Sequence, residues 1–201
     1  VRDSKSWCSI TGNTLLGLEE SGGVYTATIE KTAPAKTLQP EANRQTTGAT
    51  IIVFSDDMDK ALASFVLANG ASAVGKQVTM FFTFWGLSIL KRQERVRSKK
   101  DFMGKMFSMM LPKNAGKLSL SKMNFGGLGA SMMKDRMKRK KVDSLEMMMT
   151  QAMRAGIRLV ACQMSMDIMG VNRDELINGV EIGGVATYME AAGKAGVNLF
   201  I

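Results

Sequence analysis

The sequence predicts a doubly wound α/β domain, with a mainly parallel sheet and helices on both of its faces. From residue 49 onward, short apolar runs alternate with segments of helical pattern, which is the order that βαβ units produce. A βαβ crossover is right-handed and leaves its two strands parallel. The first apolar run, residues 49–54, is nearly continuous, as a strand buried on both faces requires. These observations indicate one parallel sheet within residues 49–201.

The segment before this domain is predicted to be a short helix and a β-hairpin, followed by a linker. Residues 4–11 have a helical pattern, and two alternating runs, 15–20 and 24–29, flank a Ser-Gly-Gly turn. One helix and one hairpin bury too little apolar surface to form an independent domain. We therefore expect residues 1–31 either to be the end of a larger unit or to pack on the rest of the chain. Residues 32–48 hold two of the three prolines and few apolar residues, which indicates a linker.

The elements of the α/β domain follow in order along the chain. The predicted strands are residues 49–54, 77–84, 155–161, 180–182 and 197–201, and the predicted helices are residues 58–70, 144–154, 163–169 and 184–192. Ser55, Asp56 and Asp57 follow the first strand and can cap the first helix. Gly70 and Gly170 are the expected stop signals of the helices that they follow.

Residues 91–142 interrupt this alternation. Between residues 91 and 141 there are 16 Lys and Arg against three Asp and Glu, so the net charge of +9 originates in this segment. Twelve of the 18 methionines lie between Met103 and Met153. So long an insertion is usually a lid, an assembly element or a partly disordered segment. Packing between subunits is favoured over contact with a partner protein or a membrane surface, and nucleic acid is disfavoured because aromatic residues are few.

The amino-acid composition excludes many catalytic mechanisms and metal sites. The chain has no histidine, which excludes Ser-His-Asp and Cys-His mechanisms and histidine-liganded metals. Two cysteines are too few for a disulfide scaffold or a zinc site. We therefore expect neither a metal nor a cofactor, and thiol chemistry is the simplest that remains. No apolar run follows residue 1, and the longest apolar stretch, residues 78–90, is too short to cross a bilayer, so we expect a cytoplasmic protein.

Cys162 is the candidate catalytic residue. It follows the predicted strand 155–161 and precedes the predicted helix 163–169. In open α/β sheets, ligands bind beyond the carboxyl ends of the strands. The first turn of a helix offers free N–H groups and the positive end of the dipole, which favour a thiolate and would stabilise a persulfide anion. Position alone supports a buried structural cysteine equally well, because free cysteines are among the most buried residues.

Further residues are expected to line a pocket around Cys162 at the same edge of the sheet. Gly179, Gly183 and Gly184 surround the start of a helix where backbone amides can hold an anion, although a plain turn is the commoner use of such glycines. The carboxylates that follow the first strand would disfavour a thiolate if they faced it. The pocket candidates are Gln163, Met164, Ser165, Asp167, Gly183, Gly184, Thr187, Ser55 and Asp56.

Three motifs occur in order along the domain. They are residues 76–91 (KQVTMFFTFWGLSILK), 160–170 (VACQMSMDIMG) and 179–190 (GVEIGGVATYME), and the run 197–201 follows them. Together they resemble the DsrE-like superfamily, in the branch often labelled peroxiredoxin-like, over residues 49–201. The resemblance implies a doubly wound α/β fold, homo-oligomeric assembly and sulfur transfer through Cys162. Peroxidase activity does not follow, because the chain has no thioredoxin-type peroxidase pattern.

The N-terminal segment is similar to the second half of a TusA-like domain. The similarity lies in residues 7–16 (WCSITGNTLL) and 23–29 (GVYTATI). The half that would carry the Cys-Pro catalytic motif of such domains is absent, so we interpret residues 1–31 as a remnant that cannot relay sulfur by that motif. Cys8 lies beside Trp7 on a short predicted helix and is expected to be structural.

The sequence therefore predicts a sulfur-relay protein, a sulfurtransferase-like carrier if it acts as an enzyme. In this hypothesis Cys162 receives a sulfane sulfur from a donor protein as a persulfide and passes it to the thiol of an acceptor protein. The alternative is a non-catalytic module that tethers sulfur-handling or membrane partners through residues 91–141, with Cys162 merely buried. A binder of small anions at the sheet edge is a third hypothesis.

Overall fold

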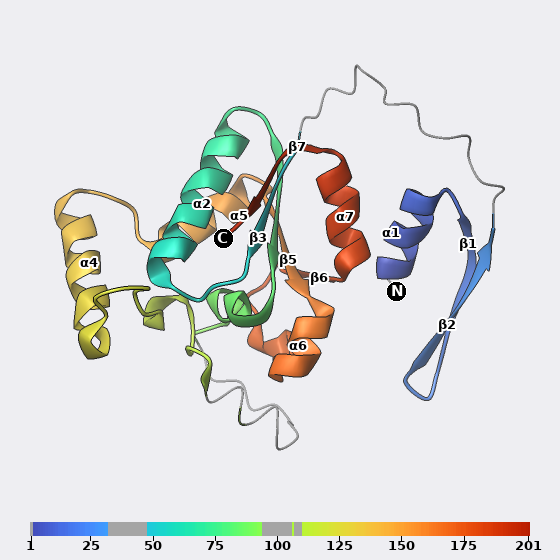
Figure 1. Ribbon diagram of the computed structural model, residues 1–201, viewed down its shortest axis with the longest axis horizontal. Coiled ribbons are helices and arrows are strands. Elements are labelled where there is room, and N and C mark those ends of the chain that lie inside the picture. Colours follow the sequence, from blue (N-terminus) through green and yellow to red (C-terminus); the bar gives the residue numbers. More distant parts are fainter. Residues whose placement is uncertain (1, 32–47, 94–105, 107–109) are drawn as a thin grey trace.

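The computed structural model describes residues 2–31, 48–93, 106 and 110–201. In these residues one sheet has two antiparallel strands, and the other has five strands in the order β6-β5-β4-β3-β7 (Figure 1). Every strand pair of the five-stranded sheet is parallel. Helices cover both of its faces, so the predicted doubly wound α/β fold is confirmed.

The elements occur close to their predicted places. In chain order they are α1 (Arg2–Thr11), β1 (Thr14–Ser21), β2 (Val24–Glu30), β3 (Gly48–Val53), α2 (Met58–Ala73), β4 (Gln77–Phe82), the 3-10 helix η1 (Phe84–Leu90), η2 (Ala115–Lys117), η3 (Phe125–Gly127), α4 (Leu128–Arg139), α5 (Leu145–Arg154), β5 (Arg158–Cys162), α6 (Gln163–Met169), η4 (Arg173–Glu175), β6 (Glu181–Gly183), α7 (Val185–Gly193) and β7 (Ala195–Phe200). Two boundaries differ from the prediction by three residues, and the others differ by at most two. Helix α2 continues past Gly70, and β5 begins only at Arg158, because Gly156 has a positive φ of 75° and belongs to the preceding turn.

The sheet face under α2 and α5 holds the main core. Alternate residues of β3, β4 and β5 point to this face, among them Ile51, Met80 and Leu159, each at most 1% exposed. Phe65 of α2 packs on Phe82 of β4 with ring centroids 6.1 Å apart. Burial of each such side chain stabilises the fold by roughly 1.5–3 kcal/mol, so this face provides most of the hydrophobic stabilisation.

The opposite face has a thinner cover. Phe81, Val160 and Cys162 form a small buried cluster there, and Tyr188 of α7 packs against it. The rings of Phe81 and Tyr188 lie 5.4 Å apart. Nearby, the Thr50 hydroxyl donates to the side-chain oxygen of Asn198, which joins β3 to β7. A mixture of apolar and polar contacts therefore holds α7 to the sheet.

The N-terminal helix and hairpin are present and pack on the rest of the chain. Helix α1 lies against α7 and also contacts β6, so α7 is placed between the sheet and α1 (Figure 1). Cys8 of α1 is 4% exposed, while every residue of β2 is exposed. The hairpin thus projects from the body, and α1 makes the contact with the α/β domain.

Part of the basic insertion joins the main core. Leu111, Ala115 and Leu118 are buried in it, and the backbone N–H of Met58 donates to the carbonyl of Ser119. Helix α4 lies beyond α2 and leaves most of its side chains exposed (Figure 1).

Some of the sequence predictions fall on residues outside the described ranges. These are residues 32–47 of the predicted linker and residues 94–105 and 107–109 of the insertion. Gly48, predicted as the last linker residue, is the first residue of β3. No helix in the described part of the chain is both long and apolar enough to cross a membrane.

Replacing Gly86 with alanine should destabilise the protein by about 1–3 kcal/mol, because the new Cβ would lie 2.2 Å from the carbonyl oxygen of Val53. Unfolding in urea measures this change in the free energy of unfolding. Gly70→Ala is the matched control: it lies within α2 with open space around it, and it should stabilise by roughly 0.5–1 kcal/mol. Equal effects of the two substitutions would contradict the packing described for Gly86.

Candidate functional site

Cys162 lies where β5 ends and α6 begins. It is the last residue of the strand and the N-cap of the helix, with an extended backbone of φ −69° and ψ 115°. Gly170 ends α6 in the left-handed conformation, at φ 62°, which suits glycine. The thiol is therefore at the carboxyl edge of the sheet, as predicted, yet it accepts no capping hydrogen bond and its residue is only 2% exposed.

The structure brings Gly183 and Thr187 next to this cysteine. Gly183 ends β6 directly opposite Cys162 in the parallel register. A Cβ on Gly183 would lie 2.9 Å from the side chain of Thr187, which is itself buried on α7. Gly184 is the N-cap of α7. The absence of a side chain at Gly183 thus lets α7 approach the end of the sheet closely, beside the thiol.

Helix α6 carries the other candidates near Cys162. Ser165 is fully buried, and its hydroxyl lies 2.7 Å from that of Thr83, which connects α6 to the residue after β4. Gln163 donates a hydrogen bond of 2.9 Å to Asp167, and both side chains are exposed. Met164 is 53% exposed. Of these four residues, Ser165 alone is buried in the protein, whereas the other three form the outer surface of α6.

Ser55 and Asp56 lie at the same edge but follow β3, and β4 separates that strand from β5. Ser55 is engaged locally, because its hydroxyl donates to the Asp57 carboxylate at 2.8 Å and accepts from the Asp57 backbone N–H. Asp57 also forms an ion pair of 2.7 Å with Lys60. These residues form the turn that leads into α2, and the structure does not bring them into one cluster with Cys162.

Burial raises the pKa of the Asp56 carboxyl above its ordinary value of 3.8, and the neighbouring Asp57 carboxylate acts in the same direction. A hydrogen bond from its own backbone N–H and the charge of Lys60 oppose this rise. The ionised form of Asp56 is thus held at some cost to the folded state.

The sequence patterns did not identify three residues that lie near the thiol. Thr83 directly follows β4, so the rule that ligand sites lie at carboxyl ends of strands could have found it. Phe81 and Tyr188 have no comparable signal. Their contact joins a central strand to a helix far along the chain, and only the tertiary structure pairs them.

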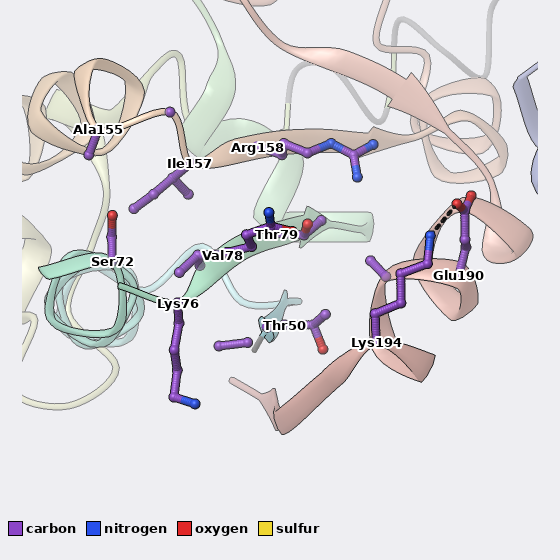
Figure 2. A pocket seen from close by; sticks show the side chains of 15 residues that line it. Thr50, Ser72, Lys76, Val78, Thr79, Ala155, Ile157, Arg158, Glu190 and Lys194 are labelled. Atoms are coloured by element: carbon purple, nitrogen blue, oxygen red, sulfur yellow. Dashed lines mark hydrogen bonds and ion pairs between the residues drawn. The ribbon is translucent and has the colours of Figure 1, made fainter. Parts of the chain in front are cut away.

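A cavity of about 460 Å³ lies at the opposite edge of the sheet, where the strands begin. Its lining includes Gln77 and Arg158 from β4 and β5, and it includes none of the predicted pocket residues. Figure 2 shows the ion pair between Glu190 and Lys194 at one side of this cavity and Lys76 at another. The cavity is therefore separate from Cys162.

A parallel sheet with a cysteine at its carboxyl edge, in a sequence without histidine, makes residues 48–201 a small thiol-bearing α/β domain. The chain belongs to the DsrE/DsrF/DrsH-like family, whose family model matches residues 45–200. This confirms the resemblance seen in the three motifs. Residues 1–44 lie outside the match, so the similarity of the N-terminal segment to TusA-like domains stays a prediction.

Individual relatives cover most of the domain. YrkE of Bacillus subtilis is 45% identical over 157 residues, which are 78% of this chain and 98% of that protein. A sulfur carrier protein, DsrE2 of Allochromatium vinosum, is 34% identical over 152 residues, 75% of this chain and 96% of its own. Among solved structures, that of YchN from Escherichia coli aligns with a TM-score of 0.46 and 11% identity, covering 77% of this chain and 99% of YchN.

Replacing Asp56 with asparagine should raise the thermal stability at neutral pH, because it removes a carboxylate whose ionisation the folded state disfavours. Its raised pKa means that the folded state binds more protons than the unfolded chain between pH 3.8 and that raised value. The stability contribution of Asp56 therefore falls as the pH rises through this window, and the advantage of Asp56→Asn should disappear as the pH is lowered through it.

Thermal unfolding at pH 7 and at pH 4 measures the effect. Asp57→Asn is the control. The Asp57 carboxylate accepts a hydrogen bond from Ser55 and forms an ion pair with Lys60, so its neutralisation should lower the thermal stability of the protein. An advantage of Asp56→Asn that is the same at both pH values would contradict the assignment.

Proposed function

We propose that this protein carries a sulfane sulfur as a persulfide on Cys162 and passes it to the thiol of an acceptor protein. The observation that carries the proposal is the place of Cys162 at the carboxyl edge of the sheet, in a domain of the DsrE/DsrF/DrsH-like family. The similarity to a protein described as a sulfur carrier supports it. Donor and acceptor proteins, homo-oligomeric assembly and a cytoplasmic location are part of the same proposal.

The transfer consists of two thiol exchange steps without net oxidation. The Cys162 thiolate attacks the outer sulfur of a donor persulfide, R–S–SH, and the donor S–S bond breaks. The bonding electrons leave with the inner sulfur as R–S⁻, and the proton stays on the transferred sulfur, so Cys162 becomes Cys–S–SH. An acceptor thiolate then attacks that outer sulfur, and the Cys162 thiolate is released.

The surroundings of Cys162 suit a carrier more than a hydrolytic enzyme. Phe81, Val160 and Tyr188 provide an apolar environment, which limits the access of water and of unrelated thiols to a bound persulfide. The bond between Ser165 and Thr83 holds the first turn of α6 against the end of β4. Cys8, the other thiol, is buried on α1, and nothing assigns it to the exchange.

Incubation with a persulfide donor should add the mass of one sulfur atom to the wild-type chain and to Cys8→Ser, and a reductant should remove it. Cys162→Ser should gain none, because it lacks the nucleophile. Intact-mass spectrometry of the three proteins measures this. A sulfur adduct that is lost in Cys8→Ser and kept in Cys162→Ser would refute the relay. The absence of any adduct on natively folded wild-type protein would also refute it.

A second candidate function is attachment to an anionic membrane surface through the basic insertion, and the exposure of α4 favours it. Leu128 and Met132 are 67% and 72% exposed and lie one turn apart. Arg136 and Arg139 continue the same side of the helix. Apolar side chains surrounded by cations are the pattern of helices that lie on anionic lipid surfaces.

Vesicles of phosphatidylglycerol should bind the protein, and vesicles of phosphatidylcholine should not, if α4 attaches to membranes. Met132→Glu should weaken binding to the anionic vesicles about tenfold, because it removes an apolar side chain as well as adding a charge. Ser131→Glu on the same helix adds only the charge and should weaken binding less. Cosedimentation with the vesicles measures binding. Absence of binding to both lipids, or an equal loss of binding in the two variants, would contradict this function.

A further inference from the structure

The burial of Cys162 raises the question of how a partner reaches it. The residue is 2% exposed, and a thiol exchange needs the attacking sulfur to approach along the S–S axis. A protein donor or acceptor is too large to enter without displacing whatever covers the thiol. Some element at the carboxyl edge of the sheet must therefore open.

Helix α7 is the element that covers this cluster. Tyr188 packs against the cluster of Phe81, Val160 and Cys162, and Thr187 is buried against Gly183 beside the thiol. Because β6 pairs with β5 at Cys162 itself, the connection from β6 into α7 passes next to the sulfur. A displacement of α7 would uncover Cys162 from this face.

The described contacts hold α7 to the sheet less firmly than the helices of the other face. Thr187 is its one buried residue, whereas α2 buries five residues and α5 buries four. Val185 and Met189 of the same helix are 63% and 53% exposed. The Tyr188 hydroxyl lies 3.4 Å from that of Thr50, which is a long hydrogen bond. Few buried apolar groups are the mark of an element that opens locally at low cost.

Helix α1 also holds α7 in place. Its contact with α7 is more extensive than the contact of α7 with any strand, and it also contacts β6. Figure 1 shows α1 along α7, on the side away from the sheet. Cys8 is 4% exposed, whereas most of the other side chains described in residues 4–31 are exposed. The interface between α1 and α7 therefore contributes to keeping α7 closed over the thiol.

We propose that α1 is a latch that holds α7 over Cys162, so that the thiol becomes accessible when α1 is released. This inference rests on the proposed function, because control of access to the thiol is useful only to a protein that exchanges sulfur there. Release of α1 would couple the position of the N-terminal helix and hairpin to the reactivity of a site in the α/β domain.

A pair of substitutions at Cys8 tests the latch. The chain has two cysteines, so Cys8→Glu and Cys8→Ser each leave Cys162 as the one thiol that a maleimide can alkylate. Cys8 is a buried side chain of α1, so glutamate there places a carboxylate among the groups that α1 packs on and should weaken its packing, whereas serine is nearly the same size and should preserve it. Alkylation of Cys162 under native conditions, followed by intact mass, should be at least about tenfold faster in Cys8→Glu. Equal rates in the two folded variants would overturn the latch.

Tyr188→Ala in the Cys8→Ser background separates the cover from the latch. It removes the ring that packs on the cluster and should speed alkylation while α1 stays in place. Acceleration by Tyr188→Ala without acceleration by Cys8→Glu would show that α7 covers the thiol but that α1 does not hold it, and it would overturn the latch.

Hydrogen exchange of the unaltered chain gives a test that does not depend on how the variants fold. Helix α1 has ten residues, and so short a helix is marginal in water without tertiary contacts, so its release should also unfold it. If α7 opens only after that release, amides of α1 should exchange at least as fast as those of α7. Faster exchange in α7 than in α1 would contradict the latch.

The latch and the relay can fail separately. Maleimide needs no sulfur transfer, so a chain that shows the acceleration but takes no sulfur from a persulfide donor keeps the latch and loses the relay. A chain that takes sulfur on Cys162 at equal rates in both Cys8 variants keeps the relay and loses the latch.

Discussion

The parallel sheet buries side chains on both of its faces, and the two faces are covered unequally. Helices α2 and α5 bury one face under a large core, while α7 covers the other in the described part of the chain. Because side chains alternate along a strand, Leu159 and Ala161 point into the large core, and Val160 and Cys162 point to the thinly covered face. The cysteine thus lies on a strand that the large core holds firmly, under a helix with little core of its own.

Because of this asymmetry, the sheet fixes the position of the Cys162 thiol, while a different element, α7, controls access to it. The proposed relay needs its thiol in a defined position, and the five-stranded sheet provides that position through β5, which pairs with a strand on each side. It also needs a route to the thiol that does not require unfolding. A lightly packed helix at the edge provides such a route, because the surface buried under it is small.

The two segments that extend the domain lie on opposite sides of it. The N-terminal helix and hairpin lie on the α7 side, outside the matched residues 45–200. The insertion lies on the α2 side, where Leu111 and Leu118 join the main core and α4 projects beyond it. Contacts made by α4 are therefore remote from Cys162, whereas contacts made by α1 lie directly behind its cover.

The sequence by itself determined the class of fold and the place of the cysteine. Continuous apolar runs such as residues 49–54 are typical of strands buried on both faces, and strands that alternate with helices indicate a parallel sheet. The position of Cys162 after such a run then placed it at the carboxyl edge. These inferences succeeded because they depend on local patterns and on the geometry of a single crossover.

The tertiary structure alone decided which residues surround the thiol. Ser165 and Gly183 lie beside it, but Ser55 and Asp56 do not, because the strand order β6-β5-β4-β3-β7 places β4 between them and Cys162. The contact of Tyr188 with Phe81 and the docking of α1 on α7 are equally beyond a sequence pattern. Strand order and helix docking depend on packing between segments far apart in the chain, and periodicity within one segment does not record them.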